Sequence, residues 1–349
     1  MRQFFLFTIF FILNAMPLSA QSYDNLWKQV GEAQNKDLPK TAIEVLDKII
    51  VKATNEKEYG HLLKAQLSKA KEVTSITPDS LQPEVQRLVK EEEGFRSSNP
   101  VLAAVLQSVL GGIYEENSTL GEDHMEKSKA YYLKSLSNPE MLADAKVGSI
   151  VPLTVVRTDS KFFNNDLLHV LSFQARNYSL MHDFYEKAGC REAACLAACF
   201  GLKERELTRA DAKAATSPMV KEIDSLMQVY ADLDVSGELA LCKYRILKGA
   251  EDVKPGQLVD FIDMAQKRWA NWKRIQELQN ERNNLVQPTS SVDLGCQMLL
   301  PDKERVVKLE NMRNISALSM KLARVNSASG KRTSSGLPSS SPVTCSPEK

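Results

Sequence analysis

The sequence has almost no net charge and few histidines. It contains 45 Lys and Arg residues, 44 Asp and Glu residues, and only 4 His residues among 349. Proteins that bind nucleic acid rely mainly on clustered positive charge to hold phosphate chains. The balanced composition therefore argues against nucleic acid as a partner.

Motifs of common catalytic and cofactor sites are also missing. The chain has no H-E-x-x-H motif, no glycine-rich phosphate loop, no G-x-S-x-G motif and no C-x-x-C pair. The histidines, which are scattered over predicted helices without fixed acidic partners, are His61, His124, His169 and His182. A nucleophile pair of Cys190 and His182 is conceivable, but a turn at Gly189 separates them and nothing marks an oxyanion hole. We expect no catalytic residue, no cofactor, no metal and no enzymatic activity.

The cysteines do not have the spacing of a small disulfide scaffold. There are six, at Cys190, Cys195, Cys199, Cys242, Cys296 and Cys345. Cys195 and Cys199 are four positions apart on one predicted helix, so a bridge between them would strain that helix. A zinc site would need further ligands, and His182 is the only candidate upstream. We expect unpaired and mostly buried thiols.

The N-terminus has the pattern of a secretory signal peptide. Arg2 precedes an apolar stretch over residues 4–13, and Leu18-Ser19-Ala20 supplies small residues before a cleavage site. Such a short stretch cannot cross a hydrocarbon core, which needs about 20 apolar residues, and no second apolar span follows. We expect residues 1–20 to be a cleaved signal, and the protein to be exported to the periplasm, the extracellular space or the outer envelope without a stable membrane span.

Residues 21–285 carry a helical hydrophobic pattern that recurs in pairs. Units of two helices at this spacing stack into α-solenoids, so the sequence predicts a mainly α, tetratricopeptide-like solenoid. The units match in spacing more than in residues. The predicted helices, interrupted by an irregular stretch over 147–164, are 23–34, 38–53, 61–73, 81–92, 100–116, 125–136, 166–175, 179–188 and 191–202.

Local signals fix some of these helices more firmly than others. Asn99 before Pro100, and Ser217 before the next proline, are N-caps followed by proline at the first helical position. Residues 101–113 are apolar almost all round, which predicts a central, covered helix. The acidic run over residues 91–93 is most simply a solvated face.

Residues 255–285 form the longest helical pattern. A continuous helix of this length would span about 45 Å and could act as a strut. Basic residues flank Trp269 and Trp272, which could indicate a membrane or nucleic-acid surface, but Glu277 and Glu281 lie on the same helix. We interpret the segment as an apolar stripe with a solvated charged face.

After residue 288 the pattern changes to short, strand-like runs. We predict strands within 292–300, 305–309 and 318–325, with a turn at 301–303. Three strands with one apolar face need a cover. Residues 327–349 are rich in Ser, Pro, Gly and Lys, which is the composition of a disordered tail and supplies no such cover.

Several segments resemble the N-terminal helical region of the large alpha-2-macroglobulin family proteins of Bacteroides-type bacteria. They are YDNLWKQVGEAQNKDLPKTAIEVLDKI from Tyr23, YGHLLKAQL from Tyr59, PDSLQPEV from Pro78, VLAAVLQSVLGGIY from Val101, DLLHVL from Asp166 and FYEKAGCREAACLAA from Phe184. The segment LLPDKERVVKLENMRNISALSMKLARVN from Leu299 resembles the opening strands of that family's first β-sandwich.

The resemblance implies an exported protein whose full-length relatives trap or inhibit proteases. In the family that activity resides in β-sandwich domains, a bait segment and, in some members, a C-x-E-Q thioester. No cysteine of this sequence has that motif: Cys190 is followed by Arg-Glu-Ala and Cys296 by Gln-Met-Leu. No bait segment is recognisable, so no functional residue transfers to this chain.

These observations lead to two hypotheses from different classes. In the first, residues 21–285 are the non-enzymatic front end of an alpha-2-macroglobulin-like inhibitor, and residues 291–326 are the start of a β-sandwich that the chain does not complete. In the second, the chain is a stand-alone exported helical-repeat module that binds a protein, peptide or glycan. Both imply protein partners such as proteases or cell-envelope proteins, and neither requires a cofactor.

Overall fold

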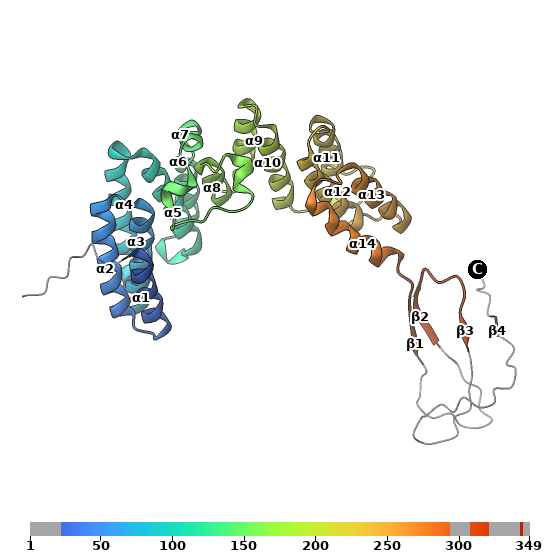
Figure 1. Cartoon of the computed structure of the whole chain (residues 1–349), viewed down its shortest axis with the longest axis horizontal. Helices are drawn as coiled ribbons and strands as arrows, with labels where there is room; N and C mark the ends of the chain where they lie inside the picture. The colour runs from blue at the N-terminus through green and yellow to red at the C-terminus, as the bar shows by residue number, and fades with distance from the viewer. Residues whose placement is uncertain (1–21, 294–307, 321–342, 345–349) are drawn as a thin grey trace, which may run out of the picture. The chain divides into compact units, whose positions relative to one another are not determined.

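The computed structural model describes residues 22–293, 308–320 and 343–344. Within these residues the chain is mainly α, with 14 α-helices and 73% helical content (Figure 1). Its contacts divide it into two compact units. Unit 1 comprises the described residues up to Glu206 together with Gln228–Ser236. Unit 2 comprises Leu207–Met227 and the described residues from Gly237 onward.

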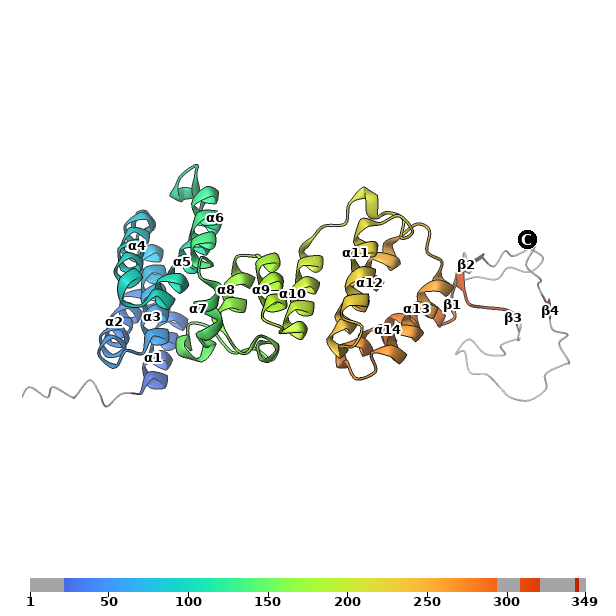
Figure 2. The ribbon, with the colours of Figure 1, turned by 90° about the horizontal axis from the view of Figure 1, so that it is seen from above.

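Unit 1 is built from successive helices in which neighbours along the chain pack against each other, as Figure 2 also shows. This confirms the prediction of packed helix pairs. The helices are α1 (Tyr23–Asn35), α2 (Pro39–Glu56), α3 (Tyr59–Ile76), α4 (Leu81–Ser98), α5 (Pro100–Glu116), α6 (His124–Ser135), α7 (Pro139–Asp144), α8 (Leu167–Gln174), α9 (Tyr178–Lys187) and α10 (Arg191–Glu204).

Helix α5 is the covered central helix that its composition predicts. Its first turn is capped by Asn99, whose Oδ1 accepts a hydrogen bond from the Leu102 N–H at 3.3 Å. Most of its residues are buried. A Cβ atom at Gly111 would lie 2.7 Å from the Tyr132 ring, so the missing side chain lets α6 approach α5 closely.

A long irregular loop joins α7 to α8, as the sequence predicts. It contains two short 3₁₀ turns, η4 (Val147–Ile150) and η5 (Ser160–Phe163). Its ends are joined: the Val147 N–H donates to the Asn165 carbonyl and the Leu167 N–H to the Ala145 carbonyl, each at 2.9 Å. The loop therefore leaves and re-enters the helical stack at one place.

Unit 2 contains α11 (Pro218–Val229), whose last two residues belong to unit 1, and α12 (Gly237–Gly249). The predicted start after Ser217 is confirmed, because the Ser217 Oγ accepts a hydrogen bond from the Val220 N–H at 3.1 Å. The Asp211 carboxylate accepts hydrogen bonds from the Ser217 hydroxyl and from Thr208, and these lower the Asp211 pKa to about 2.

The prediction of one long helix over 255–285 is wrong. The segment forms α13 (Pro255–Arg268), the 3₁₀ turn η8 (Lys273–Gln276) and α14 (Glu277–Val286), and α13 packs against α14. The chain breaks at Trp269, which is 2% exposed and ends α13 as its C-cap. The break forms a further helix pair in place of a strut.

The strand pattern appears next, at somewhat different positions. Strand β1 (Thr289–Asp293) pairs antiparallel with β2 (Lys308–Arg313), and β3 (Ser319–Met320) pairs with β4 (Val343–Thr344). Strand β4 lies within the segment predicted to be a disordered tail, and the rest of that segment lies outside the described residues. The predicted signal peptide and the predicted turn at 301–303 lie outside the described residues.

Candidate functional site

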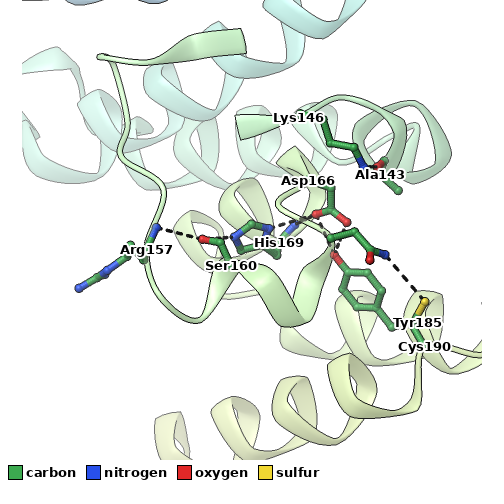
Figure 3. A network of polar contacts seen from close by, with 9 residues as sticks. Ala143, Lys146, Arg157, Ser160, Asp166, His169, Tyr185 and Cys190 are labelled. Atoms are coloured by element: carbon green, nitrogen blue, oxygen red, sulfur yellow. Dashed lines mark hydrogen bonds and ion pairs between the residues drawn. The ribbon is translucent and has the colours of Figure 1, made fainter. Parts of the chain in front are cut away.

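The most extensive buried polar network of unit 1 lies beneath the loop between α7 and α8 (Figure 3). It consists of Ser160 on η5, Asp166 and His169 at the start of α8, and Tyr185 on α9. All four residues are at most 5% exposed. Three different elements therefore contribute polar groups to one buried cluster.

The Asp166 carboxylate is the acceptor at the centre of this network. It caps α8 by accepting the His169 backbone N–H at 3.0 Å, and it lies 3.1 Å from His169 Nδ1. The Tyr185 hydroxyl donates to both carboxylate oxygens, at 2.9 and 2.8 Å. Burial raises the pKa of Tyr185, and the nearby Asp166 charge raises it further, so Tyr185 is a permanent hydrogen-bond donor.

One tautomer of His169 gives every polar side chain of this network a hydrogen-bond partner. With the proton on Nδ1, His169 donates to Asp166, and its Nε2, 3.2 Å from the Ser160 Oγ, accepts the Ser160 hydroxyl proton. The Ser160 Oγ in turn accepts the Arg157 backbone N–H at 3.2 Å. The Phe163 ring stacks on the imidazole with centroids 5.1 Å apart.

The order Ser160, His169, Asp166 is that of a nucleophile triad, but the surroundings favour a structural role. A catalytic serine must be reached by substrate, whereas Ser160 is 2% exposed and its hydroxyl is held between His169 and a backbone amide. Fully satisfied buried networks stabilise one arrangement of the chain. This network fixes the loop to α8 and α9.

A second buried carboxylate, Glu92 on α4, joins three helices. It is 0% exposed and accepts hydrogen bonds from Arg96 and, on α5, from Gln107. The Lys134 ammonium on α6 lies 3.4 Å away. Burial alone would raise the Glu92 pKa, but the hydrogen bonds from Arg96 and Gln107 and the charge of Lys134 lower it overall. The expectation of a fully solvated acidic run over 91–93 is therefore wrong for Glu92.

Unit 2 contains a comparable contact around Glu238 on α12. This side chain is 2% exposed and accepts hydrogen bonds from the Trp272 indole N–H at 3.0 Å and from Arg274 at 2.7 Å. These donors belong to the turn between α13 and α14. The segment 267–274 therefore makes contacts inside unit 2. The burial of Trp269 agrees with the apolar stripe predicted for this segment.

The histidines and cysteines considered from the sequence are dispersed. His182 contacts Asp183 and Tyr230, whereas Cys190 contacts Asn164 and the Ala188 carbonyl. Cys195, Cys199 and Cys242 are buried thiols, and Cys190 is half-buried. The expectation of histidines without acidic partners is wrong for His169 and His182, which contact Asp166 and Asp183. The D-x-x-H pattern of residues 166–169, in which the aspartate caps a helix, could have predicted the contact between His169 and Asp166.

Among the residues that the structure describes, no group of three or more His, Cys, Asp or Glu side chains is arranged to hold a metal ion. Over the same part of the chain, no helix combines the length and apolar character needed to cross a membrane.

Comparison with known proteins finds no matching family model, no matching curated protein and no matching solved structure.

Proposed function

We propose that this chain is a non-enzymatic helical scaffold at the N-terminal side of an exported protein of alpha-2-macroglobulin type. The proposal rests on the sequence resemblance and on the order of elements, in which stacked helix pairs are followed by antiparallel strands. In this role the helices hold and present the β-sandwich domains on which protease inhibition depends in the family. The chain itself contributes architecture and protein contacts.

The observation that carries the proposal is the direct connection between α14 and an uncovered β-hairpin. Arg313, the last residue of β2, and Asn314 donate hydrogen bonds to the carbonyls of Asn284 and Leu285 at the end of α14, each at 2.6 Å. Every residue of β2 is exposed, including Leu309 and Met312. A two-stranded hairpin is marginal alone and gains stability by packing against further strands, as a sandwich domain would provide.

A genomic and cellular experiment tests the placement. DNA that follows codon 349 should encode macroglobulin-type strands, and expression in a Gram-negative host should give a periplasmic protein that begins at Gln21. Unrelated DNA together with a cytoplasmic protein that retains Met1 would contradict the placement.

A screen with ester, peptide and glycoside substrates should stay at background, and turnover that disappears in Cys190→Ala would contradict the non-enzymatic role.

The second candidate is a stand-alone exported helical-repeat binding module. The stacking of helix pairs in unit 1 favours it, because such repeats commonly present extended surfaces to other proteins. A monodisperse, folded monomer of the 349-residue chain together with unrelated downstream DNA would support this candidate over the first.

A further inference from the structure

The loop between α7 and α8 exposes two adjacent valines. Val155 is 67% exposed and Val156 is 52% exposed, and Val151 nearby is 42% exposed. Residues 155–157 belong to no helix, strand or turn. Single exposed apolar residues are normal on protein surfaces, but a β-branched pair at these exposures forms a small apolar patch on a connecting segment.

The backbone of the same valines is unpaired. Among the hydrogen bonds of the described residues, none involves the N–H or C=O group of Val155 or Val156. The flanking groups are bonded: the Leu153 N–H donates to the Ile150 carbonyl at 2.9 Å, and the Arg157 N–H to the Ser160 Oγ at 3.2 Å. Free donors and acceptors beside apolar side chains are the groups with which an added strand pairs.

The loop is held in place on both sides of this exposed edge, defined here as residues 154–157. On one side the backbone of Val151 lies directly against Gly60 of α3, where a Cβ atom would collide with the Val151 carbonyl oxygen. On the other side Ser160 is fixed by His169. Binding to a segment whose position is already fixed costs less conformational entropy than ordering a free loop.

The exposed charges beside this edge are basic, whereas Asp159, which lies between them in the sequence, is half-buried. Arg157 and Lys161 are exposed, and within the described residues neither forms an ion pair. Lys161 lies over the Phe162 ring at 5.0 Å, and the Arg157 side chain points away from the buried network in Figure 3. Two basic groups next to an apolar edge complement an acidic partner and speed its association.

We propose that residues 154–157 are a docking edge for an extended, acidic peptide segment of a protein partner. The segment pairs its backbone with Val155 and Val156, places apolar side chains against the valines, and directs its carboxylates toward Arg157 and Lys161. This inference goes beyond the scaffold role and does not depend on membership of any family.

Fluorescence anisotropy with the full chain tests the docking edge. The probe is a labelled nonapeptide of alternating valine and threonine flanked by glutamates; its controls are a lysine-flanked version and a version with a central proline. We expect saturable binding of the glutamate-flanked peptide and binding of both controls weaker by at least about tenfold. Absence of saturable binding, or equal binding of the three peptides, would overturn the proposal.

Matched variants locate the binding site. The double variant Val155→Ser, Val156→Ser and the double variant Arg157→Glu, Lys161→Glu should each weaken binding by at least about tenfold, and the second should prefer the lysine-flanked peptide. Leu133→Ser, at another exposed apolar residue of unit 1 (66% exposed), should bind like the parent. Circular dichroism melting verifies that each variant is folded.

Sedimentation velocity tests whether a second copy of the chain, in place of an acidic peptide segment, occupies the docking edge. The parent chain should be monomeric without the peptide. A dimer that disappears in Val155→Ser, Val156→Ser would identify a second copy of the chain as the occupant, and unchanged peptide affinity in both double variants would place binding elsewhere. Either result overturns the proposal.

Discussion

Buried carboxylates link helices that the sequence alone leaves unconnected. Glu92, Asp166 and Glu238 are at most 2% exposed, and each accepts hydrogen bonds from a second element. A buried charge is tolerated only when it is paired and hydrogen-bonded, so such a residue specifies its surroundings. These residues therefore determine which helix faces meet.

Glu92→Ala should destabilise the chain by about 2 kcal/mol, because the variant loses charge-assisted hydrogen bonds from Arg96 and Gln107. The cost stays below that of a fully buried ion pair because Arg96 and Lys134 are 46% and 40% exposed and can be solvated. Urea denaturation measures the change. Glu93→Ala, at an exposed neighbour, should leave the midpoint nearly unchanged; equal effects of the two substitutions would contradict the role of Glu92.

His61 should make stability depend on pH. Its Nδ1 accepts the Trp27 indole N–H at 2.9 Å, and burial lowers its pKa below the usual 6.5. Because the folded pKa is lower than the unfolded one, the unfolded chain binds more protons near pH 6. Stability is then greatest above pH 6.5 and falls as the pH drops toward the folded pKa.

Urea denaturation between about pH 7.5 and 5.5 measures this dependence. His61→Gln keeps a hydrogen-bond acceptor for Trp27 and should remove the His61 part of the slope. His182→Gln, at a histidine elsewhere in unit 1, should retain it. A parent slope identical to that of His61→Gln would show that His61 does not contribute.

At the scale of elements, glycines permit close approach at particular contacts. A Cβ atom at Gly237, the first residue of α12, would lie 2.8 Å from the Trp272 ring and 3.2 Å from the Trp269 side chain. Gly256, in the first turn of α13, has nothing within 4 Å of the same position. Gly237 therefore lies in a tightly packed position and Gly256 in an open one, so the second serves as a control for the first within unit 2.

Gly237→Ala should destabilise the chain by about 1 to 3 kcal/mol, because the added methyl group displaces the half-buried Trp272 ring and crowds the buried Trp269 side chain. Gly256→Ala should be neutral or stabilise by up to about 1 kcal/mol, since alanine favours helix and has room. Thermal melting followed by circular dichroism compares them. Similar changes in both variants would mean that the packing around Trp272 is looser than the structure indicates.

The loop between α7 and α8 should depend on its buried anchor. Ser160→Ala removes the acceptor of the Arg157 N–H, a loss of about 1 kcal/mol that raises the population of the open loop roughly fivefold. Trypsin should then cut after Arg157 faster by a similar factor. Ser149→Ala, at an exposed serine elsewhere in the loop, is the control, and equal cleavage rates in parent and Ser160→Ala would contradict the anchoring role.

At the scale of the whole molecule, each unit has its own core. Leu46, Leu106 and Leu171 are among the buried residues of unit 1, and Ile223, Leu239 and Ile262 are among those of unit 2. Strand β2 contributes no buried residue. The helices therefore supply the apolar burial that stabilises the described chain.

A chain that ends at Val286 should keep its melting temperature within about 2 °C, because β2 buries no residue. It should also self-associate less, since the uncovered hairpin presents Leu309 and open strand edges. Differential scanning calorimetry and sedimentation velocity measure the two effects. A fall of many degrees on shortening would show that the strands stabilise the helical units.

The sequence alone specified where several helices begin, because caps and hydrophobic periodicity are local. Helix α5 starts and ends as predicted, and the caps at Asn99 and Ser217 form the expected hydrogen bonds. Local patterns also predicted the irregular loop after α7. Patterns within one segment suffice for such features.

Only the tertiary structure decided the contacts that join distant segments. The break after α13 directs Trp272 and Arg274 to Glu238, the burial of Glu92 depends on Gln107 and Lys134, and the network at His169 needs Ser160 and Tyr185. In each case a polar group is stabilised by partners from another element. Whether such a residue lies in solvent or in a core depends on the packing of whole helices, which periodicity along one segment does not encode.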